Sequence, residues 1–253
     1  MAEATSPPEH HLVIVGGGAG GLPLATALGD KLGDKNRGHA DITLVDRFEM
    51  HLWKPLLHEV AAGRMDAAAH DVDYLALGYW RHFRFRQGAI VALDRAGRKL
   101  TLGAVDDDEG KLMLPERVLA YDTLILCIGS TTNDFGVPGV AANAISLDTA
   151  IDADRFHRRL LAACVRADDE AAQGKLARVD IVIIGAGATG VELAAEIRQT
   201  TRAHVGYGLD KPDPEKDIHL TLLEAAPRIL PQLGEKIARA ATELLSGVDV
   251  SVR

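Results

Sequence analysis

The stretch from Leu12 to Asp46 constrains the fold more strongly than any other part of the chain. Residues 12–15 are an apolar run, and the glycine-rich turn GGGAGG follows directly at 16–21. Apolar residues then recur at helical spacing up to about residue 32, and a second apolar run ends in Asp46. This order of strand, tight turn, helix, strand and acid is typical of a βαβ unit that binds a dinucleotide.

Each glycine of this GxGxxG pattern has a separate task in such a unit. Gly16 lets the chain turn sharply, Gly18 lets a pyrophosphate approach the backbone, and Gly21 lets helix and strand pack closely. The helix N-terminus then presents unpaired N–H groups and the positive end of its dipole to the phosphates. Asp46 stands where a carboxylate accepts hydrogen bonds from a ribose. The alternative is a glycine turn without a ligand, because such turns are common.

The same pattern returns in the second half of the chain. An apolar run at 179–184 leads into GAGATG at 185–190, a helical segment follows, and a strand at 218–223 ends in Glu224. The separation of Gly190 from Glu224 exceeds the usual spacing, so we interpret residues 202–217, with two prolines and two glycines, as an inserted loop. Two such units predict two dinucleotides in one protein, with a nicotinamide that gives hydride to a flavin.

The acid of the second unit also predicts which nicotinamide cofactor binds. Glu224 would hydrogen-bond a ribose 2′-hydroxyl and repel a 2′-phosphate, which favours NADH over NADPH. Ala225 and Ala226 offer no positive charge to a phosphate, and Arg228 is the nearby cation that argues against this preference.

Composition narrows the classes of function. A net charge of −8 over 253 residues argues against a nucleic-acid partner, because phosphate backbones require a basic surface. No apolar run approaches the ~20 residues that span a bilayer. Residues 1–10 are polar and unlike a secretory signal, and we interpret them as a short disordered lead. Two cysteines in unrelated contexts imply no disulfide framework, and the scattered histidines imply no metal site.

We therefore expect an α/β chain of two Rossmann-like dinucleotide-binding domains. Residues 11–150 are assigned to the N-terminal part of an FAD-binding domain, 151–177 to a linker helix and 178–253 to an incomplete NADH-binding domain. Short strands at 89–93, 98–102 and 116–120 predict a small antiparallel insertion in the first domain, and another short strand is expected at 83–85.

Three further elements complete the expected fold. Continuous apolarity at 121–130 predicts a parallel strand that is covered on both faces and ends in a glycine turn. Residues 148–168 are expected to form a helix, with a polar break at 169–174. A helical stripe at 233–245 and an alternating strand at 248–252 end the chain.

With these motifs, the chain resembles type II NADH:quinone oxidoreductases, within the superfamily of flavoproteins that bind two dinucleotides. The resemblance covers roughly Leu12 to the end of the chain. It rests on both glycine turns with their acids, on Leu52-Trp53-Lys54-Pro55-Leu56-Leu57, on Tyr121–Ser130 and on the run LEAAPRILP at 223–231. It implies FAD and NADH as cofactors and a quinone as electron acceptor, in a respiratory NADH dehydrogenase that pumps no protons.

The resemblance also assigns site residues at matching positions. For FAD these are Gly16, Gly18, Ala19, Gly20, Gly21, Asp46, Arg47, Lys54, Pro55, Leu56, Ile90, Gly129 and Ser130. For NADH they are Gly185, Gly187, Thr189, Gly190, Glu192 and Glu224.

Two of these residues are expected to act on the chemistry. We predict that Lys54 and Glu192 pair beside the flavin, where Lys54 would favour negative charge on the reduced ring. The alternatives are an ordinary surface lysine and a glutamate on a solvated helix face.

Members of this family are longer than 253 residues, so the chain resembles their N-terminal portion. The resemblance implies that the remaining C-terminal region docks on the membrane, which would place the protein in the cytoplasm, at the inner face of the cell membrane. A homodimer is one option for its assembly. We expect these residues alone to bind FAD poorly and to transfer no electrons to quinone.

Other functions stay open on the same motifs. A disulfide reductase of this fold is excluded, because it requires a redox cysteine pair and the sequence contains no CxxC or CxxxxC. A reductase of the ferredoxin type fits the fold equally well. A protein that binds both nucleotides without turnover, as a sensor, is the alternative outside the enzymes.

Overall fold

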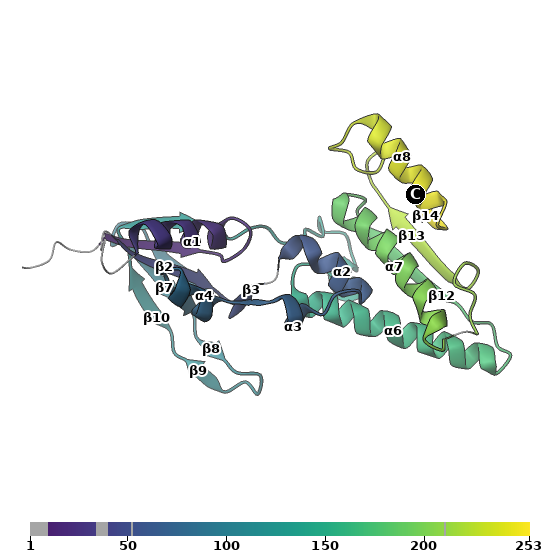
Figure 1. The fold of residues 1–253 in the computed structure, drawn as a ribbon, viewed down its shortest axis with the longest axis horizontal. Helices are drawn as coiled ribbons and strands as arrows, with labels where there is room; N and C mark the ends of the chain where they lie inside the picture. The colour runs from purple at the N-terminus through teal and green to yellow at the C-terminus, as the bar shows by residue number, and fades with distance from the viewer. Residues whose placement is uncertain (1–9, 34–39, 52, 210) are drawn as a thin grey trace, which may run out of the picture. The chain divides into compact units, whose positions relative to one another are not determined.

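The computed structural model describes residues 10–33, 40–51, 53–209 and 211–253. The chain divides into two units, one made of residues 1–53 and 70–131, the other of residues 54–69 and 132–253 (Figure 1). The expected disordered lead lies outside the described residues except for His10, which is in a strand. Residues 54–69 and 132–150, assigned to the first domain from the sequence, pack with the second unit.

A four-stranded parallel sheet forms the centre of the first unit. Its strand order is β11 (Thr123–Leu126), β1 (His10–Val15), β2 (Ala40–Asp46) and β5 (Arg84–Gln87). One face buries Ile14, Ile42 and Leu44 beneath α1 (Gly21–Leu32). The opposite face packs Val13, Val15 and Val45 against two buried leucines of β7 (Lys99–Leu102). Both faces of the central strands β1 and β2 are therefore covered, as in other parallel sheets. The edge strand β11 is partly exposed, with Leu126 at 53%, so the expectation that it is covered on both faces is wrong.

Smaller antiparallel elements complete the first unit. The sheet β10-β7-β6 joins Arg117–Ala120, Lys99–Leu102 and Ile90–Asp94, which confirms the predicted insertion. The unit also contains two antiparallel pairs of short strands. One joins β8 (Val105–Asp106) to β9 (Leu112–Leu114), and the other joins β3 (Met50–His51) to β4 (Val72–Asp73). Helix α4 (Tyr74–Trp80) follows β4 and is capped by Asp73, whose carboxylate accepts the Ala76 N–H at 2.8 Å.

The second unit is built on the parallel sheet β12-β13-β14. Its strands are Val179–Ile184, Ile218–Leu223 and Val250–Val252. Helices α7 (Ala188–Gly206) and α8 (Glu235–Ser246) connect them, as the βαβ pattern predicts. The 3₁₀ turn η1 (Lys54–Leu56) runs into α2 (Leu57–Ala62), which packs against both α7 and the long helix α6 (Ala150–Ala172). The short helices α3 (Ala67–His70) and α5 (Val140–Asn143) complete the set.

Two helices extend beyond their predicted ends. Helix α6 begins with a capping box between Thr149 and Asp152 and continues to Ala172, so the predicted break at 169–174 is wrong over most of its length. Helix α7 continues to Gly206, so the first part of the predicted loop at 202–217 is helical. Its C-terminal turns are buried at Thr200, Thr201 and His204, and this packing stabilises the extra helix.

No helix in the described parts of the chain combines the length and the apolarity needed to cross a bilayer.

Candidate dinucleotide-binding sites

The first glycine turn has the backbone geometry that its sequence predicts. Gly16 adopts φ +97° and donates its N–H to the carbonyl of Val45 at 2.8 Å. A Cβ atom on Gly21 would overlap the carbonyl oxygen of Gly16, because helix α1 crosses the turn at close range. A Cβ on Gly18, by contrast, would meet no atom within 4 Å. The turn is therefore tight where the protein packs on itself and open where a diphosphate would approach.

The second glycine turn repeats this geometry in the other unit. Gly185 adopts φ +101° and donates its N–H to the carbonyl of Leu223 at 2.8 Å. A Cβ on Gly190 would overlap the carbonyl of Gly185, and one on Gly187 would have no atom within 4 Å. The second and third glycines thus stand in the same local environment as their counterparts in the first turn. The first glycines differ, because a Cβ on Gly16 would overlap the carbonyl of Cys127, whereas one on Gly185 would meet no atom within 4 Å.

The two strand-terminal acids also occupy equivalent positions. Asp46 accepts the N–H of Gly17 at 2.7 Å and that of Phe48 at 2.9 Å. Glu224 accepts the N–H of Ala186 at 2.8 Å and that of Ala226 at 2.9 Å. The backbone hydrogen bonds from Ala226 and Ala186 lower the pKa of Glu224, so its side chain is a carboxylate at neutral pH.

These carboxylates keep the capacity to bind a ribose. Each carboxylate has about four acceptor sites and uses one on each oxygen for the backbone. The backbone N–H groups of the turns fix the orientation of Asp46 and Glu224, so their remaining lone pairs stay available beside the turns that a nucleotide would contact. The residues present therefore fit an adenine dinucleotide in each unit, with the diphosphate at the helix N-terminus.

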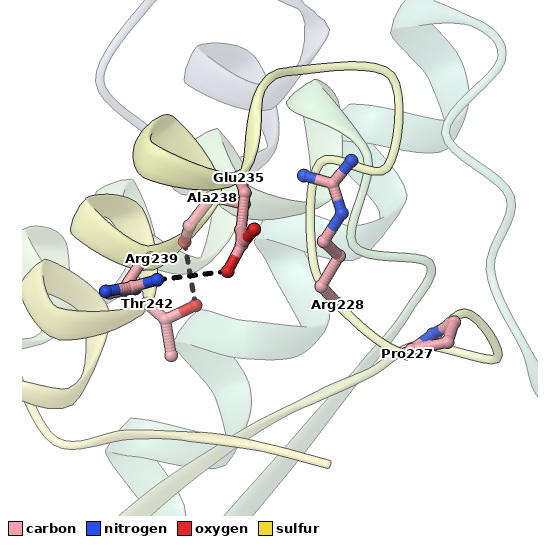
Figure 2. Close-up of a pocket in the computed structure, with 6 residues that line it drawn as sticks. All are labelled: Pro227, Arg228, Glu235, Ala238, Arg239 and Thr242. Carbon is pink, nitrogen blue, oxygen red and sulfur yellow. Dashed lines mark hydrogen bonds and ion pairs between the residues drawn. The ribbon is translucent and has the colours of Figure 1, made fainter.

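A cavity of about 450 Å³ lies beyond Glu224, between the following loop and helix α8. Figure 2 shows its lining residues: Pro227 and Arg228 from the loop, and Glu235, Ala238, Arg239 and Thr242 from α8. Arg239 pairs with Glu235 at 3.0 Å within the helix. Arg228 extends from the loop and donates to the carbonyls of Leu233 at 2.7 Å and Pro231 at 3.1 Å.

The other residues assigned to FAD in the first unit follow the turn itself or the ends of β2, β5 and β11. Ala19 and Gly20 continue the turn into α1, and Arg47 follows Asp46 with its guanidinium 4.7 Å from the ring centre of Phe48. Ile90 begins β6, two residues after Gly88, whose N–H binds the carbonyl of Asp46 at 2.8 Å. Gly129 and Ser130 follow β11, and Gly129 adopts φ +69° with open space at its Cβ position.

Lys54, Pro55 and Leu56 lie on η1 in the second unit, with Glu192. The Nζ of Lys54 lies 3.8 Å from Asp148, and Nδ1 of His58 lies 3.6 Å from Glu192. The structure thus gives each of the two residues a different partner, and a direct pair between Lys54 and Glu192 stays a prediction. Thr189, in the first turn of α7, is exposed beside the open position of Gly187.

Tyr74 is a site residue that the sequence analysis missed. Its hydroxyl donates to the carbonyl of Gly17 at 2.9 Å, and its side chain is only 2% exposed. The ring lies 5.0 Å from that of Phe85, between the glycine turn and β5. No local motif marks this residue, because the contact joins positions 57 apart in the chain. The same holds for His58 and Asp148. His58 of α2 approaches Glu192 because α2 packs against α7, and Asp148, just before α6, approaches Lys54 of η1.

Two glycine turns of similar geometry, each hydrogen-bonded to a strand-terminal acid, are typical of the class of oxidoreductases that bind two dinucleotides. The sequence profile of the pyridine nucleotide-disulphide oxidoreductase family matches residues 10–253, and the chain belongs to this family.

Among individual proteins, the chain is 40% identical to a type II NADH:quinone oxidoreductase of Haemophilus influenzae, over 96% of this chain and 57% of that protein. It is 32% identical to a type II NADH:quinone oxidoreductase of Mycobacterium tuberculosis, over 97% of this chain and 49% of the relative. These similarities confirm the resemblance drawn from the motifs. The chain spans about half the length of the curated relatives it matches.

A solved structure agrees with this fold. The NDH2 of Plasmodium falciparum in complex with NADH superposes with a TM-score of 0.77 at 20% identity, over 96% of this chain and 47% of that one. At this identity the likeness supports the α/β fold with its parallel sheets and carries no residue role.

Proposed function

We propose that this chain carries the FAD- and NADH-binding part of a type II NADH:quinone oxidoreductase. The observation that supports this most directly is the duplicated turn, with an open second glycine and an oriented carboxylate in each unit. When bound, NADH supplies a hydride and FAD passes the electron pair on to a quinone. The similarity to curated relatives with this activity selects it from among the reactions of the fold.

The residues of the chain contribute position and electrostatics. In the first unit, the Gly16–Gly21 turn and Asp46 bind the diphosphate and ribose of FAD. In the second unit, the Gly185–Gly190 turn and Glu224 bind NADH and select it over NADPH through the carboxylate. Holding the donor and acceptor rings in fixed positions lowers the barrier without a protein nucleophile.

Lys54 and Glu192 are proposed to act beside the flavin. Lys54 lies at the start of η1 and supplies positive charge, while Glu192 lies two residues after the third glycine of the NADH turn. Their partners Asp148 and His58 hold them on the same unit. This assignment rests on the resemblance and on that placement.

We also propose that the full-length protein is cytoplasmic and works at the inner face of the cell membrane, where it reaches its quinone. The resemblance to membrane-associated dehydrogenases supports this location, and a homodimer is the assembly we propose. A segment outside these residues would provide the membrane contact.

The test uses one glycine in each turn of the full-length protein. Gly18→Val and Gly187→Val add side chains where no atom lies within 4 Å, so both variants should fold while the nucleotide is blocked. We expect Gly18→Val to lose FAD, and Gly187→Val to keep FAD but lose NADH oxidation with a water-soluble quinone. The control is Gly206→Ala in α7, which has equally open space and lies in neither turn.

The outcomes separate the alternatives. Nucleotide binding without turnover in the unmodified protein supports the sensor, and turnover only with an iron–sulfur acceptor supports a ferredoxin-type reductase. Unchanged FAD content in Gly18→Val together with unchanged NADH oxidation in Gly187→Val refutes both assigned sites.

A further inference from the structure

The backbone of Ala186 is held through both its N–H and its carbonyl within the proposed NADH turn. Its N–H donates to Glu224 at 2.8 Å, and its carbonyl accepts the N–H of Leu230 at 2.8 Å. Ala186 is completely buried, so water does not replace either partner. The position of the turn therefore depends on Leu230 as well as on the acid.

Leu230 is held in an uncommon backbone conformation. It adopts φ +48°, in the left-handed region that leucine rarely occupies. Ile229 and Leu230 are both buried, and the carbonyl of Leu230 accepts the N–H of Leu233 at 2.9 Å. Such a conformation persists only where the surroundings hold it in place.

Arg228 supplies that hold. Its Nη1 donates to the carbonyl of Leu233 at 2.7 Å and its Nη2 to the carbonyl of Pro231 at 3.1 Å, so one planar guanidinium closes the loop around Leu230. Figure 2 shows that Arg228 extends from the loop that lines the cavity, whereas the Arg239–Glu235 pair lies on α8.

We propose that Arg228 is a positioning residue of the NADH site: it fixes the loop at 229–233 so that Leu230 holds the Ala186 peptide, and it does not serve as a ligand for a 2′-phosphate. The proposal rests on the proposed binding of NADH at this turn. It explains how an arginine four residues after Glu224 coexists with a site that selects NADH.

The first unit shows the same arrangement around an equivalent peptide. The N–H of Gly17 donates to Asp46 at 2.7 Å, and its carbonyl accepts the Tyr74 hydroxyl at 2.9 Å. In both turns, the residue after the first glycine is held by the acid on one side and by an external donor on the other. Two independent instances argue that the second contact belongs to the site.

The experiment compares Arg228→Met and Arg228→Lys in the full-length protein, with Arg239→Met as matched control in the same cavity. For both Arg228 variants we expect the KM for NADH to rise about tenfold, the change produced by losing one net hydrogen bond of the turn, with kcat at saturating NADH within about twofold of the parent. The ratio of kcat/KM for NADPH to that for NADH should not fall. Arg239→Met should leave all three quantities unchanged.

A second readout does not require nucleotide binding. In the protein without NADH, Arg228→Met should speed hydrogen exchange of the Leu230 amide about tenfold, while Arg239→Met should not. Faster Leu230 exchange without any NADH binding by the parent would support the loop contact and refute the proposed cofactor.

Three results would overturn the positioning role. They are an unchanged KM for NADH in Arg228→Met, full rescue by Arg228→Lys, which would show that charge alone matters, and a selective loss of NADPH activity, which would show a phosphate ligand.

Discussion

Replacing Tyr74 with phenylalanine tests how the FAD turn is held, because it removes one oxygen atom from a buried contact. The hydroxyl donates to the carbonyl of Gly17 at 2.9 Å, while the ring packs on Phe85 with its centre 5.0 Å away. Phenylalanine keeps that packing and leaves the carbonyl without this donor. Leaving a buried acceptor unsatisfied costs about 1–3 kcal/mol.

The loss should be observed in FAD binding as well as in stability. Gly17 also donates its N–H to Asp46, so a shift of this peptide displaces both the turn and the acid that would bind ribose. If about 1.4 kcal/mol of the loss is expressed in binding, the Kd for FAD rises about tenfold. Burial raises the pKa of the Tyr74 hydroxyl, so it remains a proton donor and the effect should be constant from pH 6 to 9.

The assay is titration of the FAD-depleted full-length protein with FAD, followed by flavin fluorescence, together with its thermal denaturation. Tyr79→Phe is the matched control, because Tyr79 lies on the same helix with 76% of its surface exposed. Equal FAD affinity and equal melting temperature for Tyr74→Phe and Tyr79→Phe would show that the contact with Gly17 does not position the turn.

Three further predictions concern stability. Gly17→Ala places a Cβ where it would overlap the Tyr74 hydroxyl, so we expect a loss of about 1–3 kcal/mol in urea denaturation. A loss as small as that of Gly206→Ala, where the Cβ meets no atom within 4 Å, would contradict this packing. Arg198 is 1% exposed and donates to the carbonyls of Pro214, Ile218 and Asp249. Arg198→Met should therefore lower the free energy of unfolding by about 3–5 kcal/mol in the same measurement. Arg178 is exposed, so Arg178→Met should lower it little. Burial, and then the charge of His157, lower the pKa of His204 below 6.5. The unfolded chain therefore binds more protons, and stability should fall as pH drops through 6.5 and below. Burial lowers the pKa of His51 as well, so His51 contributes to the same loss of stability at low pH. His204→Gln should reduce the slope of melting temperature against pH, and an unchanged slope would refute the assignment to His204.

The parts of the site that the sequence predicted are those encoded locally. The turns at Gly16 and Gly185 follow from glycine spacing, because a positive φ and a close helix crossing leave few other residues acceptable. Asp46 and Glu224 follow from their place at strand ends, since the carboxyl ends of parallel strands meet at the binding edge.

The parts that the sequence did not predict depend on tertiary packing. Tyr74 reaches Gly17 only because α4 lies next to β5, and no period or motif signals that contact. Two prolines and two glycines at 202–217 suggested that α7 ends before residue 206, but the burial of Thr201 and His204 stabilises the helix up to Gly206. In α6, an alanine-rich final turn continues the helix where charged side chains suggested a break.

The two turns reach the same geometry by different means, and this difference determines where each is vulnerable. In the first unit a side-chain hydroxyl holds the peptide after the leading glycine, so one substitution at Tyr74 removes the contact. In the second unit a backbone N–H holds it, and no side-chain change at Leu230 removes that donor except proline. The side chain that acts on the proposed NADH turn is therefore Arg228. It holds the backbone of the loop through the carbonyls of Leu233 and Pro231 and does not contact the turn. A residue can thus govern a nucleotide site through the hydrogen bonds of one backbone position, without contacting the nucleotide itself.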